Sequence, residues 1–155
     1  MKSIPSIILP IIKEDDFTNK DLFNVLKNKK VIIFGVPGAF TPTCSEKHFP
    51  GFIQFYETIK EKGIDEIYCL SINDPFVMKS WLLCYEKKHK ILGIADGNGD
   101  LTKLLQLTTD KSSNFMGIRC KRFAMIVENN IIIKKFVEKA GKLDVSSAEN
   151  MLNEL

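Results

Sequence analysis

GVPGAFTPTCS, residues Gly35–Ser45, joins an apolar run to a helical pattern, and this junction decides the fold prediction. The run before it, Lys29–Val36, is rich in β-branched residues and predicts a buried strand. The segment after it, Thr43–Lys62, has apolar residues at helical spacing and predicts a helix with a kink at Pro50-Gly51. A plain strand-to-helix turn needs neither two prolines nor a cysteine, so the junction predicts a functional loop.

The remaining segments alternate between strand and helix patterns, with no internal repeat and no long linker. We therefore predict one α/β domain over residues 1–155, a central mixed β-sheet with helices on both faces. This order is that of thioredoxin-like folds, in which functional groups lie beyond the carboxyl end of the first central strand. The predicted elements are strands at Ile64–Ile72 and Ile91–Ala95, helices at Phe76–Glu86 after Pro75 and around Leu101–Leu107, a hairpin of Arg122–Val127 with Ile131–Val137 turning at Asn129-Asn130, and a helix from a capping box at Ser146–Glu149 to Leu155.

The composition is that of an ordinary globular protein, with 45% hydrophobic and 26% charged residues. A net charge of +3 without a stripe of basic and aromatic residues argues against a nucleic-acid partner. The apolar N-terminal stretch is interrupted by Pro5 and Pro10, which is typical of neither a signal peptide nor a membrane span. We therefore expect a cytoplasmic protein with no membrane partner, or a mitochondrial or plastid one if a longer precursor was trimmed.

The four cysteines, Cys44, Cys69, Cys84 and Cys120, form no CxxC pair and have no zinc-site spacing. Free thiols in a reducing compartment are the default for this pattern. Cys44 and His48 lie four residues apart, but two ligands do not make a site, so we expect neither a metal nor a cofactor. Because His48 lies one turn beyond Cys44, it is poorly directed to act as its base, and we expect a surface or interface histidine.

Cys44 is the strongest candidate for a reactive residue. Thr41 can cap the following helix with Pro42 at its first position, or Thr43 can cap it in a box with Glu46. Either arrangement puts Cys44 in the first helical turn, where the helix dipole favours the nucleophilic thiolate. The alternative is a small buried apolar residue, which is how most free cysteines behave.

The residues around this sulfur predict a pocket for a small substrate. Thr41 supplies a hydroxyl, Pro37 a rigid wall without an N–H, and Phe40 an apolar wall, while Gly38 permits a close backbone approach. A bond that breaks on thiolate attack, such as O–O or S–S, fits this arrangement best. A histidine paired to the cysteine, which acyl transfer would need, is not evident.

Arginine is rare in this chain, since only Arg119 and Arg122 among its 22 basic residues are arginine. A chain that uses lysine for general surface charge keeps arginine where a planar group with several donors is needed. Arg122 is the better candidate for such a site. For Arg119 we expect an ion pair within the domain or a dimer.

The segment PGAFTPTCS resembles the active-site segment of peroxiredoxins, of the type II or peroxiredoxin-5-like subfamily, which includes plant type II and protozoan antioxidant-protein members. The resemblance continues through nearly the whole chain in four further motifs: KHFPGFIQ, CLSINDPFVMKSW at Cys69–Trp81, RCKRFAMIV at Arg119–Val127, and VSSAENML at Val145–Leu152. It implies a thioredoxin-like fold and a thiol peroxidase that reduces hydrogen peroxide and organic hydroperoxides in antioxidant defence.

The resemblance also implies the roles of individual residues. Cys44 matches the peroxidatic cysteine, which becomes a sulfenic acid, and Thr41 matches the threonine that binds the peroxide and the sulfur. Pro37 matches the shielding proline, and Arg122 the arginine that stabilises the thiolate and polarises the peroxide. The same loop lines the substrate pocket through Gly38, Phe40 and Thr43.

One departure from the pattern concerns the resolving cysteine. Some related members carry one where this chain has Val145, whereas plant members carry a second cysteine that matches Cys69. Cys69 is either a resolver that works with thioredoxin or an inert core residue, and we favour the core. Cys84 and Cys120 receive no role.

We therefore expect a one-Cys homodimer that glutathione or glutaredoxin reduces, with thioredoxin as the alternative reductant. A redox-relay module and a thiol–disulfide oxidoreductase are the competing functions.

Overall fold

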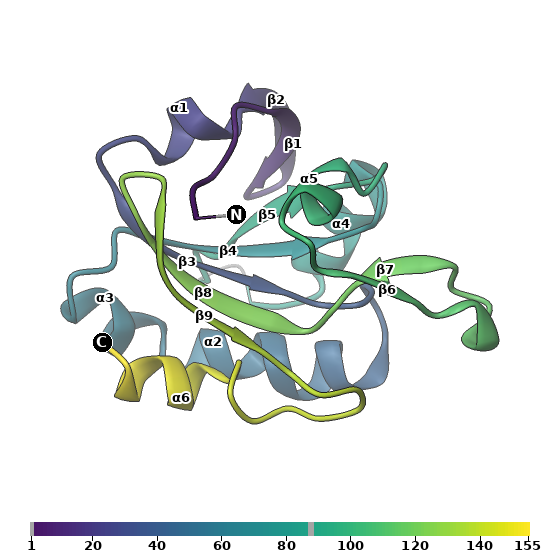
Figure 1. The fold of residues 1–155 in the computed structure, drawn as a ribbon. Helices are drawn as coiled ribbons and strands as arrows, with labels where there is room; N and C mark the ends of the chain where they lie inside the picture. The colour runs from purple at the N-terminus through teal and green to yellow at the C-terminus, as the bar shows by residue number, and fades with distance from the viewer. Residues whose placement is uncertain (1, 87–88) are drawn as a thin grey trace.

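The computed structural model describes residues 2–86 and 89–155 and confirms the α/β class (Figure 1). Seven strands form one mixed sheet in the order β2-β1-β5-β4-β3-β8-β9. The inner strands β3, β4 and β5 run parallel, and β8 pairs antiparallel with β3. The strands are β1 (Ile8–Lys13), β2 (Asp16–Asp21), β3 (Lys30–Gly35), β4 (Glu66–Ser71), β5 (Leu92–Ala95), β8 (Phe123–Glu128) and β9 (Ile131–Val137).

Helices cover both faces of the sheet, as predicted. The core on one face packs against α2 (Phe49–Gln54), α3 (Tyr56–Glu61), α4 (Pro75–Leu83) and α6 (Ala148–Asn153). The core on the other face packs against α1 (Leu22–Leu26) and α5 (Asp100–Leu104). A small second sheet of β6 (Thr108–Asp110) and β7 (Ile118–Cys120) extends from the main body and carries the short 3-10 helix η2 (Ser112–Asn114) at its tip (Figure 1).

The helix predicted at Thr43–Lys62 is broken more than the sequence indicated. Pro42 and Thr43 are already helical, and the segment continues as a π-helix, η1 (Cys44–His48), in which the amide of Phe49 donates to the carbonyl of Cys44. The wide turn lies just before Pro50, which has no N–H and whose ring crowds the preceding turn. α2 runs through Pro50-Gly51, where the kink was expected, with Pro50 near its start, and the helix is interrupted at Phe55.

Other boundaries also differ from the predictions. The helix predicted to reach Glu86 ends at Leu83, and the C-terminal helix ends at Asn153 rather than Leu155. Its cap is the side chain of Ser147, which accepts from the amide of Asn150, because Ser146 is used elsewhere. The β1–β2 and β6–β7 hairpins were not predicted.

The predicted functional loop in Gly35–Ser45 lies beyond the carboxyl end of β3, as expected for this fold. Every residue of β3 after Lys30 is buried, as are all residues of β4 after Glu66, so the loop starts from a rigid support. The amide of Val36 continues the sheet pairing by donating to the carbonyl of Leu70 at 3.0 Å. No helix in the described part of the chain is both long and apolar enough to span a bilayer.

Candidate active site

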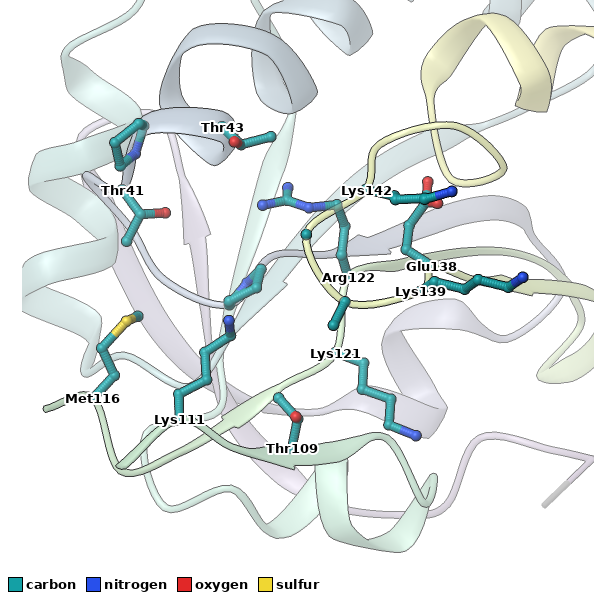
Figure 2. A pocket seen from close by; sticks show the side chains of 14 residues that line it. Thr41, Thr43, Thr109, Lys111, Met116, Lys121, Arg122, Glu138, Lys139 and Lys142 are labelled. Carbon is teal, nitrogen blue, oxygen red and sulfur yellow. The ribbon is translucent and has the colours of Figure 1, made fainter. Parts of the chain in front are cut away.

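A pocket of about 550 Å³ opens beyond the end of β3 (Figure 2). Four of the predicted site residues line it, namely Pro37, Thr41, Thr43 and Arg122. The first three follow β3 in the chain, whereas Arg122 lies just before β8, and β8 is the strand next to β3. The pairing of β3 with β8 therefore brings together residues that are about half a chain apart.

Cys44 is the first residue of η1, and its side chain is fully buried. The Nη2 atom of Arg122 donates to its Sγ at 3.1 Å. A guanidinium at this distance stabilises a negative sulfur, since a hydrogen bond between charged partners is stronger than one between neutral partners. The structure thus joins the two residues that sequence reasoning selected for independent reasons, 78 positions apart.

The expectation that His48 lies at the surface is wrong, because only 1% of this residue is exposed. Its Nδ1 lies 2.9 Å from Nη1 of Arg122, and its Nε2 lies 2.9 Å from the carbonyl oxygen of Ser146. A guanidinium can only donate and a carbonyl can only accept, so the proton is on Nε2 and Nδ1 is the acceptor. Both ring nitrogens are therefore engaged, and neither is free to bind a metal.

His48 is neutral at physiological pH. Burial and, after it, the charge of Arg122 lower the pKa of its imidazole to about 3, against the opposing effects of Ser146 and Glu138. Phe34 and Phe52 pack against the ring, with centroids 5.0 and 5.7 Å from its own. The i, i+4 spacing of Cys44 and His48 was visible in the sequence, but it did not reveal that Arg122 lies beside both residues.

Glu138, which sequence reasoning missed, supports His48 from the other side. Its carboxylate accepts from the amide of Ser146 at 2.8 Å and from the hydroxyl of Ser146 at 2.7 Å. Burial acts to raise the pKa of Glu138, but hydrogen bonds from Asp144 and Ser146 outweigh it and lower the pKa. The amide of Glu138 also donates to the carbonyl of Arg122 at 2.9 Å. One network thus runs from Glu138 through Ser146, His48 and Arg122 to the sulfur.

Thr41 does not cap the helix with its side chain. Its hydroxyl donates to the carbonyl of Gly38 at 2.7 Å, and its own carbonyl accepts from the amide of Ser45 at 2.9 Å. Thr43 also makes no capping hydrogen bond. Because the hydroxyl of Thr41 already donates its hydrogen bond to Gly38, its oxygen can only act as a hydrogen-bond acceptor toward the pocket.

The two remaining pocket candidates lie differently. Gly38 is buried under the loop, where an added Cβ would lie 3.1 Å from side-chain atoms of Met116 and Thr41. Phe40 has a backbone φ of 65° and is 53% exposed, so it points outward instead of walling the pocket. Neither residue is among those that line the described pocket.

Arg119 forms no ion pair within the described residues, so the expected pairing inside the domain is not found. Its guanidinium instead donates to three carbonyls, those of Met116 at 2.8 Å, Ile72 at 3.2 Å and Pro37 at 3.5 Å. It thereby ties β7 to the ends of β3 and β4. Both arginines therefore use several donors at once, which lysine could not reproduce.

The other cysteines are free thiols in this structure. Cys69 lies in the middle of β4 between Phe34 and Gly93, and burial raises the pKa of its thiol well above the ordinary value. Cys120 is buried too, with a raised pKa caused mainly by burial, and its Sγ lies 3.0 Å from the carbonyl of Val36. Cys84 is exposed just after α4. Within the described ranges, no three acidic, histidine or cysteine residues cluster as a metal site would.

Comparison with known proteins defines the class of this site. The family model of redoxins matches residues 2–152. Peroxiredoxin-2D of Arabidopsis thaliana is 47% identical over 143 residues, which cover 92% of this chain and 88% of the relative. The chain therefore belongs to the redoxin family and, within it, to the peroxiredoxins of the plant type II and peroxiredoxin-5-like group.

Two solved structures share both fold and sequence. Reduced Prx3 of Vibrio vulnificus, solved in complex with H2O2, has a TM-score of 0.92 and 38% identity, and the match covers 99% of this chain and 96% of that one. The antioxidant protein of Plasmodium falciparum, a 1-Cys peroxiredoxin, has a TM-score of 0.88 and 41% identity, with 96% and 93% covered. These likenesses confirm the predicted thioredoxin-like fold and the predicted family.

Proposed function

We propose that this peroxiredoxin carries out its thiol peroxidase reaction at Cys44, with Arg122 and Thr41 as the residues that bind the peroxide and Pro37 as the residue that shields it. The observation that carries the assignment is the 3.1 Å contact between Nη2 of Arg122 and Sγ of Cys44, beside a pocket that Thr41 and Pro37 line. The Vibrio vulnificus relative was solved in complex with H2O2, which supports a peroxide as the substrate here.

In the first half-reaction, the thiolate of Cys44 attacks the terminal oxygen of the peroxide ROOH. An S–O bond forms as the O–O bond breaks, which leaves a cysteine sulfenic acid and the alkoxide RO⁻. The alkoxide takes a proton from solvent and leaves as ROH, or as water when R is hydrogen. Arg122 stabilises the charge as it moves from sulfur to the leaving oxygen, and Thr41 orients the peroxide by accepting its O–H.

In the second half-reaction, a thiol attacks the sulfenic acid, forms a mixed disulfide and releases water. A second thiol attacks this disulfide, restores Cys44 and leaves with the first as an oxidised pair. We propose one-Cys behaviour, with glutathione and glutaredoxin as reductant. The buried, protonated Cys69 supports this proposal, as does the description of the Plasmodium falciparum relative as a 1-Cys enzyme. The alternative, resolution by Cys69 with thioredoxin, needs a rearrangement of η1 or β4.

Peroxide consumption with glutathione and glutaredoxin tests the assignment of Cys44. The Cys44→Ser variant should lose the activity, whereas Cys84→Ser, which changes an exposed thiol outside the pocket, should keep it. Equal peroxide consumption by wild type and Cys44→Ser would refute the assignment. Intact-mass spectrometry after one equivalent of peroxide, without reductant, should then find one added oxygen on Cys44 and no internal disulfide.

We also propose that the chain forms a homodimer through the loops around the pocket. Large apolar side chains are exposed there: Phe40 at 53%, Ile118 at 54% and Phe115 at 99%. Side chains of this kind on neighbouring loops mark an interaction surface. Light scattering with size-exclusion chromatography should give a dimer for wild type and a monomer for Phe115→Glu. A monomeric wild type would contradict the proposal.

A further inference from the structure

The pocket is larger than its smallest substrate requires. Its volume of about 550 Å³ lies in the range of sites for small organic molecules. Hydrogen peroxide has only two heavy atoms, and a water molecule in the liquid takes about 30 Å³. The pocket therefore has room for a larger reactant, such as the organic group of a hydroperoxide or the body of a reducing thiol.

The charge of this pocket is strongly positive. Five of its lining residues are basic and one is acidic, which gives a net charge of +4, whereas the whole chain carries +3. The remaining 17 basic and 18 acidic residues sum to −1, so the excess positive charge of the protein lies at this pocket. The basic residues are Arg122 and four lysines, Lys111, Lys121, Lys139 and Lys142, which we call the lysine collar.

The lysine collar is not neutralised by the protein itself. Among the described residues, no carboxylate pairs with any of its four ammonium groups. The single acidic residue of the pocket, Glu138, is turned toward the amides of Asp144 and Ser146 and the hydroxyl of Ser146. A concentration of like charge lowers stability through repulsion, and an anion in the pocket would relieve it.

Lys111 has a special place in the collar. Figure 2 shows its ammonium group and the guanidinium of Arg122 directed toward the middle of the pocket, whereas Lys121, Lys139 and Lys142 extend outward from the rim. Lys111 is half-buried, and its backbone is held by Gly117, whose carbonyl accepts its amide at 2.7 Å. Thr109 adds a hydroxyl on the same side. Two cations and the hydroxyl of Thr109 around one space form the donor set that a carboxylate needs.

We propose that the lysine collar binds the carboxylate of the reactant, with Lys111 in contact and Lys121, Lys139 and Lys142 attracting the anion to the pocket mouth. The proposal rests on the peroxidase function described above and names its substrate class, small carboxylate-bearing molecules. The carboxylate can belong to a hydroperoxide, which oxidises Cys44, or to a thiol, which reduces it. Each source acts in a different half-reaction, so the two can be measured apart.

The experiment compares each anionic reactant with its neutral ester in stopped flow, on the full-length protein. One arm uses the hydroperoxide of linoleic acid and its methyl ester, below micelle-forming concentrations, against reduced enzyme. The other arm uses glutathione and its diethyl ester against enzyme pre-oxidised to the sulfenic acid. The measured quantity is the ratio of the two rate constants, anionic over neutral, in each arm.

Wild type should favour the anionic reactant in at least one arm, and raising the ionic strength should reduce the preference. In that arm Lys111→Gln should lower the ratio by up to about fivefold, since one charge pair of this kind contributes at most about 1 kcal/mol. Lys111→Glu should lower it further. Lys103→Gln removes the same charge from α5, outside the pocket, and should leave the ratio unchanged.

Failure of this proposal can be told apart from failure of the peroxidase assignment. If wild type shows a ratio near one in both arms, or if Lys103→Gln lowers the ratio as much as Lys111→Gln, the lysine collar has no binding role. If wild type consumes the neutral ester and Cys44→Ser does not, the peroxidase assignment still holds. If Cys44→Ser consumed both reactants as fast as wild type, the peroxidase assignment itself would be rejected.

Discussion

Arg122 and His48 are 74 positions apart in sequence, yet Nη1 of one lies 2.9 Å from Nδ1 of the other. The same guanidinium donates to the sulfur of Cys44 through Nη2. Because a planar guanidinium held at two corners has little freedom to rotate, the neutral imidazole fixes the direction of the donor that faces the sulfur. We therefore regard His48 as a positioning residue for Arg122.

Replacing Arg122 with lysine should slow the reaction with peroxide. An ammonium group cannot contact both the sulfur and His48 in a fixed plane, and loss of one preorganised donor to a developing charge costs about 100-fold or more in rate. The second-order rate constant with hydrogen peroxide in stopped flow checks this. Arg119→Lys is the matched control, because Arg119 contacts only carbonyls and the loss should be much smaller. An unchanged rate constant in Arg122→Lys would remove the role assigned to this residue.

His48→Phe should lower the same rate constant by about tenfold, since a misdirected catalytic group reduces rate even when the fold is intact. Phenylalanine keeps the ring among Phe34 and Phe52 but offers no acceptor to Arg122. His48→Asn retains an acceptor near the place of Nδ1 and should restore part of the rate. Rescue by asparagine, despite its poorer packing, separates positioning from general stability. Equal rates for the two variants would contradict the role.

The buried neutral His48 should make stability depend on pH. Its pKa is about 3 in the folded protein and 6.5 without the fold, so between these values only the unfolded chain binds the proton. Stability is therefore complete above about pH 6.5 and falls toward pH 3, with a slope of at most about 1.4 kcal/mol per pH unit from this one group.

Urea denaturation at a series of pH values measures this dependence. His48→Phe should show a shallower decline than wild type. Carboxylates contribute equally to both proteins, so the difference in slope reports on His48. Parallel curves for wild type and His48→Phe would show that the imidazole is not held neutral.

Cys69→Ala should retain turnover with glutathione and glutaredoxin. Its thiol is fully buried in β4 and burial favours the protonated form, which does not attack a sulfenic acid. Steady-state peroxide consumption and the intact mass of the oxidised protein test this together. Loss of turnover in Cys69→Ala, with a disulfide to Cys44 in wild type, would make Cys69 the resolver.

Gly35→Ala should destabilise the protein by about 2 kcal/mol, because a Cβ there overfills a packed core. Gly35 is the last residue of β3, and the added carbon would lie 2.0 Å from Cε1 of Phe123, the neighbour of Arg122. Gly51→Ala, within α2, is the control, since its Cβ would meet that of Ala148 in α6 at an ordinary 3.7 Å. Alanine should change stability there by no more than about 1 kcal/mol, in the stabilising direction. Urea denaturation of both variants measures the two effects.

Local patterns in the sequence predicted much of the fold. The β-branched run before Gly35 gave β3 to within a residue or two, and the hairpin at Asn129-Asn130 was confirmed in β8 and β9. The hairpins at the edges were missed because β2 is mostly exposed and polar, while β6 and β7 are only three residues each. Such strands carry little periodic signal, and pairing with a neighbour stabilises them.

The sequence by itself determined which residues are candidates for the chemistry: a cysteine after a proline- and threonine-rich turn, and one of only two arginines in a lysine-rich chain. Only the tertiary structure decided which side chains surround them. The pairing of β3 with β8 brings Arg122 to Cys44. The segment that leads from Glu138 into α6 packs against His48, so this residue is buried in contact with Arg122 instead of lying at the surface as expected. Spacing along a chain specifies neighbours within an element, whereas contacts across 74 or 78 residues depend on how the elements pack.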